Sequence, residues 1–277
     1  MFANNNPHSF IDIGVNLMSP AFDHDREAVL AGAETAGVKT LIITGSSIAS
    51  SAEALAFAQT HPQCKTTAGV HPHNAKDWDT AALPAARLQE LLAQESPVSA
   101  PIIAAIGECG LDYNRNFSPP QEQRKCFEDQ LMLAALLGKP VFLHERDAFD
   151  DFLSILKRHR TNLPGAVVHC FTGGAAELEA WLALDCYIGI TGWICDERRN
   201  THLIPLLRHI PADRLLLETD APYLLPRNLP RSLRGKSGRN ESCFLPHIAA
   251  FAAEILGKTP EQLAAETSAN AARLFNL

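Results

Sequence analysis

Four apolar stretches of this 277-residue chain each lead to a side chain that can bind a metal ion. These side chains are Glu108 in IIAAIGECGLD, His144 in VFLH, His169 in AVVH and Asp220 in RLLLETD. Short apolar runs of this kind are typical of buried strands, and burying an unpaired carboxylate is costly. One such ending is ordinary, but four in succession predict that these residues share a cation site.

Between these runs the sequence alternates eight times between predicted strands and predicted helices. The strands are expected at 10–17, 39–45, 65–73, 102–112, 140–144, 166–169, 186–190 and 214–220, and the helices at 28–36, 50–60, 84–93, 121–137, 148–160, 175–183, 201–209, 245–256 and 260–274. No linker or shift in composition interrupts this order. The pattern favours a single α/β domain over residues 10–277, a (β/α)8 TIM barrel, rather than a doubly wound sheet with a second domain. Because the carboxyl ends of all barrel strands meet at one face, the four metal-binding residues are expected to meet there.

Charge and cysteine content limit the compartment and the partners. The formal net charge of -7 and the pI near 5.9 argue against a surface that is basic all over, so any contact with nucleic acid must be local. Seven cysteines without a CxxC spacing, and no apolar run long enough to span a membrane, predict a cytoplasmic protein with reduced thiols. We expect no membrane partner and no obligate protein partner. Residues 1–9 are polar and are expected to form an extension before the fold.

The four side chains suit a hydrolytic metal. Mixed imidazole and carboxylate ligands are compatible with Mn, Zn, Fe, Co or Mg. A bound divalent ion lowers the pKa of a water ligand, and a neighbouring carboxylate such as Asp220 can accept the proton that this water releases. Glu108 and Asp220 are therefore the candidate catalytic residues as well as ligands. Taken singly, each of the four could instead be a hydrogen-bonded structural residue.

Two further features point to phosphate. His71 and His73, in GVHPH, lie where the third predicted strand runs into a loop, and Pro72 should force an extended backbone on His71. We assign both histidines to substrate phosphate or to the rim of the site; the alternative is that one of them merely caps a loop.

A basic stretch follows the eighth predicted strand. The segment 226–240 contains five cations and no acid: Arg227, Arg231, Arg234, Lys236 and Arg239. Barrel loops after strands seven and eight often bind phosphate, and guanidinium groups match phosphate oxygens. Arg239 is the candidate phosphate ligand, so the stretch favours a phosphodiester over an amide as substrate. The alternative is a solvated basic loop without a ligand.

Several motifs in order resemble the TatD family of metal-dependent nucleases. They are GVHPH, IGECGLD, His144 followed by Arg146, VHCFTG, YIGITG, LLLETDAPYL and RNE, and the resemblance extends from Phe10 to Leu277. It implies a barrel of the amidohydrolase type and a 3'-to-5' exonuclease that acts on single-stranded DNA and RNA. It also implies a divalent metal, Mg as the first choice with Mn or Zn as alternatives, bound by Glu108, His144, His169 and Asp220.

The first strand departs from many relatives. Where they carry an HxH pair that binds one metal, this chain has Gly14 and Asn16. We therefore predict that one metal site, built around Glu108, His144 and His169, is the tighter. Two other functions stay open: a metal-dependent hydrolase of a small amide, ester or lactone, and a non-catalytic nucleic-acid-binding protein with a decayed metal site.

Overall fold

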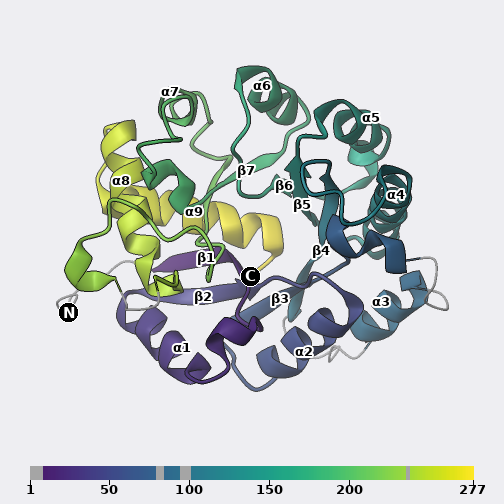
Figure 1. Cartoon of the computed structure of the whole chain (residues 1–277), viewed down its shortest axis with the longest axis horizontal. Helices are drawn as coiled ribbons and strands as arrows, with labels where there is room; N and C mark the ends of the chain where they lie inside the picture. Colours follow the sequence, from purple (N-terminus) through teal and green to yellow (C-terminus); the bar gives the residue numbers. More distant parts are fainter. Residues whose placement is uncertain (1–8, 79–83, 94–100, 235–237) are drawn as a thin grey trace. The chain divides into compact units, whose positions relative to one another are not determined.

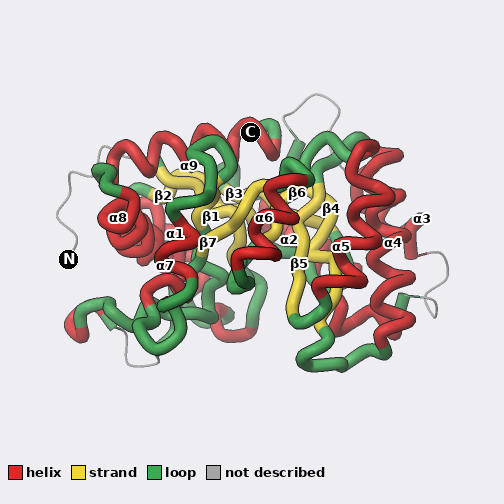
Figure 2. The backbone as a smooth tube through the Cα atoms, turned by 90° about the horizontal axis from the view of Figure 1, so that it is seen from above, coloured by secondary structure: helices red, strands yellow, loops and turns green. Residues whose placement is uncertain are grey.

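The computed structural model describes residues 9–78, 84–93, 101–234 and 238–277 (Figures 1 and 2). Its eight strands follow one another in chain order in a single sheet. They are β1 (Phe10–Val15), β2 (Val38–Ile43), β3 (Cys64–Ala68), β4 (Ile103–Asp112), β5 (Val141–Arg146), β6 (Ala166–Val168), β7 (Tyr187–Ile190) and β8 (Leu215–Leu217). The strand order and the alternation with helices confirm the predicted (β/α)8 class. The predicted extension 1–9 lies outside the described residues, apart from Ser9.

The helices also lie where the apolar periodicity predicts them. They are α1 (Arg26–Thr35), α2 (Ile48–Ala58), α3 (Pro84–Ala93), α4 (Pro120–Leu137), α5 (Phe149–His159), α6 (Ala175–Ala183), α7 (Leu203–Leu207), α8 (Leu245–Leu256) and α9 (Pro260–Phe275). Local capping explains several boundaries. Ser47 caps α2 in a reciprocal capping box with Ser50, and Gly138 ends α4 in the left-handed conformation. Among the described residues, no helix is long and apolar enough to cross a membrane.

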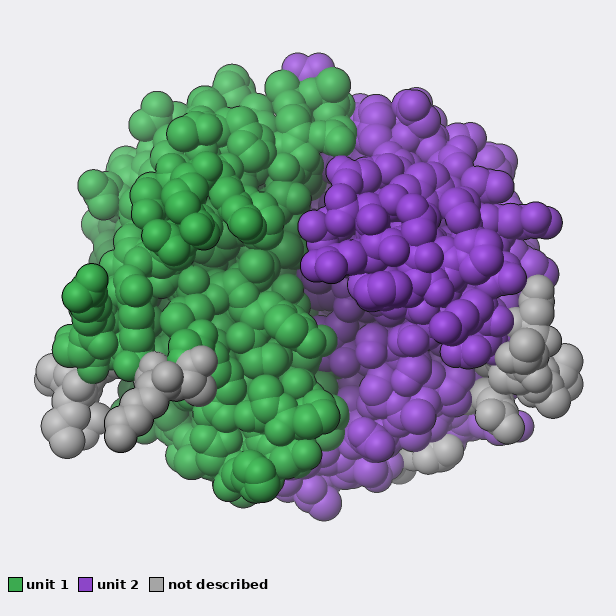
Figure 3. Space-filling model, viewed as in Figure 1, with its two compact units in different colours: residues 1–43, 170–178, 188–273 green, residues 44–169, 179–187, 274–277 purple. Residues whose placement is uncertain are grey.

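The chain divides into two compact units, which Figure 3 shows in different colours. Unit 1 comprises residues 1–43, 170–178 and 188–273. Within it β1 pairs with β2 and β7 pairs with β8, both in parallel. Helix α8 packs against β1 and β8 through its apolar face, which buries Ile248 and Ala252 completely. This burial holds the loops that follow β1 and β8 on a fixed support.

Unit 2 comprises residues 44–169, 179–187 and 274–277 and contains β3 to β6. Its strands pair in parallel, and α4 and α5 run along the outside of β4 and β5 (Figure 2). All ten residues of β4 are buried, as expected for a parallel strand covered on both faces. The rings of Phe127 and Phe152 stack at 4.7 Å, and Trp181 meets Phe152 edge to face at 5.2 Å. These pairs each add about 0.5–1.5 kcal/mol to simple burial.

Several strand ends differ from the prediction. β3 ends at Ala68, before His71, and β8 ends at Leu217, so Asp220 lies in the following loop. β4 ends on Asp112 as predicted, so Glu108 lies inside the strand, four residues before its end. These differences matter because they decide which side chains can reach the candidate site.

Candidate metal centre

The candidate site in unit 2 is built on one face of β4. Side chains alternate along a strand, so Glu108, Gly110 and Asp112 share a face. Both carboxylates are buried, with exposed fractions of 7% for Glu108 and 1% for Asp112. Two acids on one buried face require cationic or hydrogen-bonding neighbours.

The register between β4 and β5 supplies the first neighbour. His144 pairs with Gly110, so it lies between the two acids along the strand direction. Its Nδ1 lies 2.8 Å from Glu108 Oε1, and its Nε2 lies 3.6 Å from Asp112 Oδ2. Gly110, with φ of 148°, makes this approach feasible, because a Cβ at that position would overlap the carbonyl oxygen of His144.

Two more imidazoles face Glu108. His169 directly follows β6, and its Nε2 lies 2.8 Å from Glu108 Oε1 and 3.4 Å from His144 Nδ1. His71, in the segment after β3, brings its Nε2 to 3.4 Å from the same oxygen. The structure therefore brings together three of the four predicted metal ligands, Glu108, His144 and His169, and places one predicted phosphate ligand beside them.

The ligand set fits a divalent ion. Glu108 Oε1, His144 Nδ1 and His169 Nε2 form a triangle with sides of 2.8, 2.8 and 3.4 Å. Metal–ligand bonds of about 2.0–2.2 Å at tetrahedral or octahedral angles place neighbouring ligand atoms about 2.8–3.5 Å apart. The buried Nε2 of His144 has no hydrogen-bond partner among the described residues and points toward the carboxylate of Asp112. That arrangement matches the carboxylate that commonly orients a metal-binding histidine from behind.

The electrostatics of the cluster keep Glu108 ionised. Burial alone would raise its pKa, but the attraction of His71 and His169 and the hydrogen bonds of His144 and His169 hold the pKa well below its usual range. Burial likewise opposes protonation of His144, yet the neighbouring carboxylates of Asp112 and Glu108 raise its pKa. The carboxylate is therefore available as an anionic ligand throughout the neutral pH range.

The imidazole ring of His71, unlike the carboxylate of Glu108, is uncharged near pH 7. Burial lowers its pKa to about 3, against the attraction of Glu108, so the ring is neutral near pH 7. The backbone N–H of His73 donates to His71 Nδ1 at 3.1 Å, and the neutral ring must therefore carry its proton on Nε2. Nε2 lies within 4.8 Å of the ligand atoms of Glu108 and His144 but faces them as a hydrogen-bond donor. The backbone of His71 is extended, as Pro72 predicts.

Asp112 is the functional candidate that the sequence reasoning missed. Its Oδ2 lies 2.8 Å from His73 Nε2, and its Oδ1 accepts hydrogen bonds from the backbone N–H groups of Asn114 and Arg115. Burial would raise its pKa, but these contacts and His144 lower it. The signal was present, because Asp112 stands four residues after Glu108 in a strand and therefore shares its face.

Asp220 lies in unit 1, where its own surroundings orient it. The amide Nδ2 of Asn16 donates to Asp220 Oδ1 at 2.9 Å, and the backbone N–H of Asp220 donates to Gly14 O at 2.9 Å. Its φ of 54° is in the left-handed region, which costs a non-glycine residue free energy and is common at functional sites. The two residues that replace the HxH pair thus support Asp220.

Two cations of the basic stretch, Arg239 and Arg227, lie beside carboxylates. Arg239 donates to both carboxylate oxygens of Asp25 at 2.8 and 2.7 Å and to Glu241 at 2.8 Å. These bonds raise its pKa further above the ordinary value. Arg227 lies 3.4 Å from Asp196 and 3.3 Å from Glu197, and Lys236 lies outside the described residues. A role of Arg239 in phosphate binding stays a prediction, and it would require the guanidinium to exchange partners.

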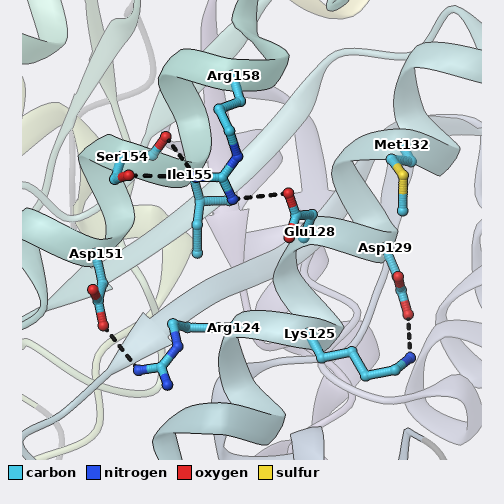
Figure 4. A pocket seen from close by; sticks show the side chains of 9 residues that line it. All are labelled: Arg124, Lys125, Glu128, Asp129, Met132, Asp151, Ser154, Ile155 and Arg158. Carbon is cyan, nitrogen blue, oxygen red and sulfur yellow. Dashed lines mark hydrogen bonds and ion pairs between the residues drawn. The ribbon is translucent and has the colours of Figure 1, made fainter.

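A pocket of about 390 Å³ lies elsewhere in unit 2, between α4 and α5 (Figure 4). Its charged side chains pair with one another, as Arg124 with Asp151, Lys125 with Asp129 and Arg158 with Glu128. All these pairs are at least partly exposed, and such pairs contribute little to stability. None of the predicted site residues lines this pocket.

Comparisons with known proteins identify the family. A family model described as TatD related DNase matches residues 11–276. A protein of Cronobacter sakazakii named 3'-5' ssDNA/RNA exonuclease TatD is 53% identical over 264 residues, which cover 95% of this chain and 97% of that protein. A protein of the same name from Edwardsiella piscicida is 53% identical over 268 residues, covering 96% and 99%.

Solved structures show the same fold. A crystal structure of YJJV, a TatD homolog from Escherichia coli, matches with a TM-score of 0.83 and 28% identity over 97% of this chain and 98% of that chain. An uncharacterized amidohydrolase from Saccharomyces cerevisiae matches with a TM-score of 0.86 and 25% identity over 97% and 100%. These matches confirm the predicted barrel of the amidohydrolase type. With a family match over nearly its whole length, the chain belongs to the TatD family of related DNases.

Proposed function

We propose that this protein is a metal-dependent 3'-to-5' exonuclease that hydrolyses phosphodiester bonds of single-stranded DNA and RNA. The observation that carries the proposal is the triangle of Glu108 Oε1, His144 Nδ1 and His169 Nε2, whose sides suit the ligands of a divalent ion. The names of the similar proteins, which describe 3'-5' ssDNA/RNA exonucleases, support the substrate class.

Glu108, His144 and His169 would hold the metal. Two imidazole nitrogens suit Mn or Zn at least as well as Mg, the ion that the family resemblance favours. When bound, the ion would polarise a phosphate oxygen and lower the pKa of attacking water. Asp112 would orient His144 from behind, because its carboxylate faces the ring nitrogen opposite the one that faces Glu108.

The remaining residues would handle phosphate and protons. The Nε2–H of neutral His71 and the ring of His73 are proposed donors to phosphate oxygens. Asp220 is the proposed fourth ligand and proton acceptor, and the amide of Asn16 would fix the orientation of its carboxylate. Arg239 is a further proposed phosphate ligand in exchange for Asp25. A cytoplasmic location is also proposed, because all seven cysteines carry free thiols, as is usual in a reducing compartment.

The decisive experiment replaces Glu108. Glu108→Ala should lower the release of nucleotides from a 3'-labelled single strand by about a thousandfold, since several kcal/mol of charge stabilisation would be lost. The assay would compare DNA and RNA strands in Mg, Mn and Zn. A strand labelled at its 5' end should shorten stepwise, which reports the direction of degradation.

The control is Glu53→Ala, which removes an exposed carboxylate on α2 of the same unit. It should match the wild type in activity and in thermal unfolding. Undiminished release by Glu108→Ala protein would refute the proposed centre. Parallel assays with carboxylic esters and lactones test the alternative substrate class, and hydrolysis of these alone would replace the nuclease proposal.

A further inference from the structure

Phe117 is an exposed aromatic side chain beside the histidines of the candidate site. It lies in the segment between β4 and α4, and 58% of its surface is exposed. The edge-to-face contact between its ring and that of His73 has a centroid separation of 4.7 Å. His73 in turn contacts His71 at 4.3 Å and lies 6.5 Å from His144. These ring contacts connect Phe117 to the histidines of the candidate site.

The segment that carries Phe117 is held firmly by buried polar contacts. Ser118 is completely buried; its hydroxyl donates to His73 O at 2.9 Å and accepts from the Lys76 N–H at 3.0 Å. Gln123 donates to Ser118 O at 2.8 Å, and Asn116 donates to Tyr113 O at 2.6 Å. The exposure of the Phe117 ring is therefore built into the fold. Single exposed apolar side chains are common, but this one is a flat aromatic ring held against a histidine of the candidate site, so its face is available to a ligand there.

The position of the ring indicates what that ligand is. A phosphate bound by His71 and His73 would bring the attached nucleoside close to Phe117, because His73 contacts both residues. Aromatic rings stack on bases without regard to sequence, since every base has a π-face. An exonuclease must accept all terminal bases, and a phenylalanine makes no hydrogen bonds that would discriminate between them.

We propose that Phe117 stacks on the base of the nucleotide at the 3' end of the substrate and so positions that end at the metal centre. This inference rests on the proposed exonuclease function and adds a specific residue for substrate binding. Phe117 acts on binding of the end rather than on bond cleavage. Its loss should therefore raise KM and leave kcat nearly unchanged.

The test compares two substrates, one ending in deoxyadenosine and one ending in an abasic nucleotide. Phe117→Ala should raise KM for the first by about 5- to 100-fold, the range expected for the loss of one base–aromatic stack. It should leave KM for the abasic strand unchanged within about twofold, because that strand has no base to lose. Phe117→Trp should restore wild-type KM on the first substrate, whereas Phe117→Leu, which keeps apolar bulk without a π-face, should not.

A second readout does not depend on turnover. In a Glu108→Ala background, the dissociation constants for the two strands are measured with and without Phe117→Ala. The preference for the base-ended strand should disappear when Phe117 is removed. An equal loss on both strands would show a structural disturbance of His73 and would overturn the inference, as would no loss on either. Absence of nucleotide release by wild-type protein would instead count against the proposed function, and this binding preference would still decide the role of Phe117.

Discussion

The pKa values of two buried carboxyl groups are shifted in opposite directions. Three imidazoles surround Glu108, and its pKa is low despite its burial. Asp12 in β1 is also fully buried, and it accepts hydrogen bonds from the backbone N–H and hydroxyl of Thr219 at 2.9 and 2.6 Å. Burial outweighs these bonds and raises the pKa of Asp12 from 3.8 to about 6. The surrounding imidazoles, rather than depth, therefore decide which acid stays ionised.

Asp12 makes unit 1 sensitive to pH. Its pKa is higher in the folded protein than in the unfolded chain, so folded protein retains a proton that unfolded chain releases. This stabilising contribution is complete below about pH 4 and is lost as the pH rises through about 6. From pH 4 to 7, the free energy of unfolding of the wild type should fall by about 2.4 kcal/mol relative to Asp12→Asn, whose side chain does not titrate.

The measurement is urea unfolding of metal-free protein at a series of pH values. Only the difference between wild type and variant is informative, because it isolates the contribution of Asp12. Asp213→Asn, at an exposed position paired with Arg214, is the control and should follow the wild type at every pH. Parallel curves for the wild type and Asp12→Asn would contradict the raised pKa.

At the scale of elements, α4 supports the ends of two strands through buried glutamines. Gln123 accepts from the Asp112 N–H at 2.8 Å and donates to Asp112 O at 3.1 Å, at the end of β4. Gln130 accepts from the Val70 N–H at 2.8 Å and donates to Val70 O at 3.0 Å, just before His71. Each amide satisfies a backbone N–H and C=O that have no strand partner. Helix α4 thereby fixes the segments that carry the candidate site.

Replacing one of these amides should therefore be costly. Gln130→Leu would leave the N–H and C=O of Val70 buried without these partners, and each such group costs about 1–3 kcal/mol. We expect the free energy of unfolding to fall by about 2–5 kcal/mol in chemical denaturation. Gln121→Leu, at an exposed position of the same helix, is the matched control and should change it by less than about 0.5 kcal/mol. A similar effect of the two substitutions would exclude this role of Gln130.

The elements that the sequence predicts best are those whose apolar pattern decides their position. β4 and α4 lie where the pattern predicts them, since burial and periodicity coincide there. The end of β8 was not predictable, because the Thr219 N–H bonds to the side chain of Asp12 instead of continuing a strand. Gln123 and Gln130 were missed as supports, although their spacing of seven puts them on the buried face of α4.

For the candidate site, the sequence predicts which residues take part but not how the neighbouring strands that carry them are aligned. Nothing in the order of residues states that Gly110 pairs with His144, and this pairing places the ring between Glu108 and Asp112. The protonation of His71 likewise depends on a backbone N–H two residues away. One partner of Arg239, Asp25, lies 214 residues away in the sequence, which no local pattern reveals. Long-range pairing of this kind is a property of the folded chain.

At the scale of the whole molecule, the metal centre should govern thermal stability. A ligand at a thousand times its dissociation constant stabilises the folded state by about 4 kcal/mol. For a protein of this size, that corresponds to a rise in Tm of about 10 °C. Adding Mn or Zn to chelator-treated protein should therefore raise Tm, and the measurement is a thermal scan at increasing metal concentration.

The variant Glu108→Ala should not be stabilised by added metal. It removes the carboxylate that faces all three imidazoles, so added metal should leave its Tm nearly unchanged. A full rise in the Tm of this variant would place the stabilising ion elsewhere in the molecule.

The missing side chain at Gly110 also constrains how the gene can vary. Any missense change there adds at least a Cβ, which would meet the carbonyl of His144 and displace the ring. The same addition at Gly138 meets no atom within 4 Å, so only the left-handed backbone, with φ of 61°, opposes it. Over generations, selection should purge mutations of codon 110 while codon 138 drifts, although both encode the smallest amino acid.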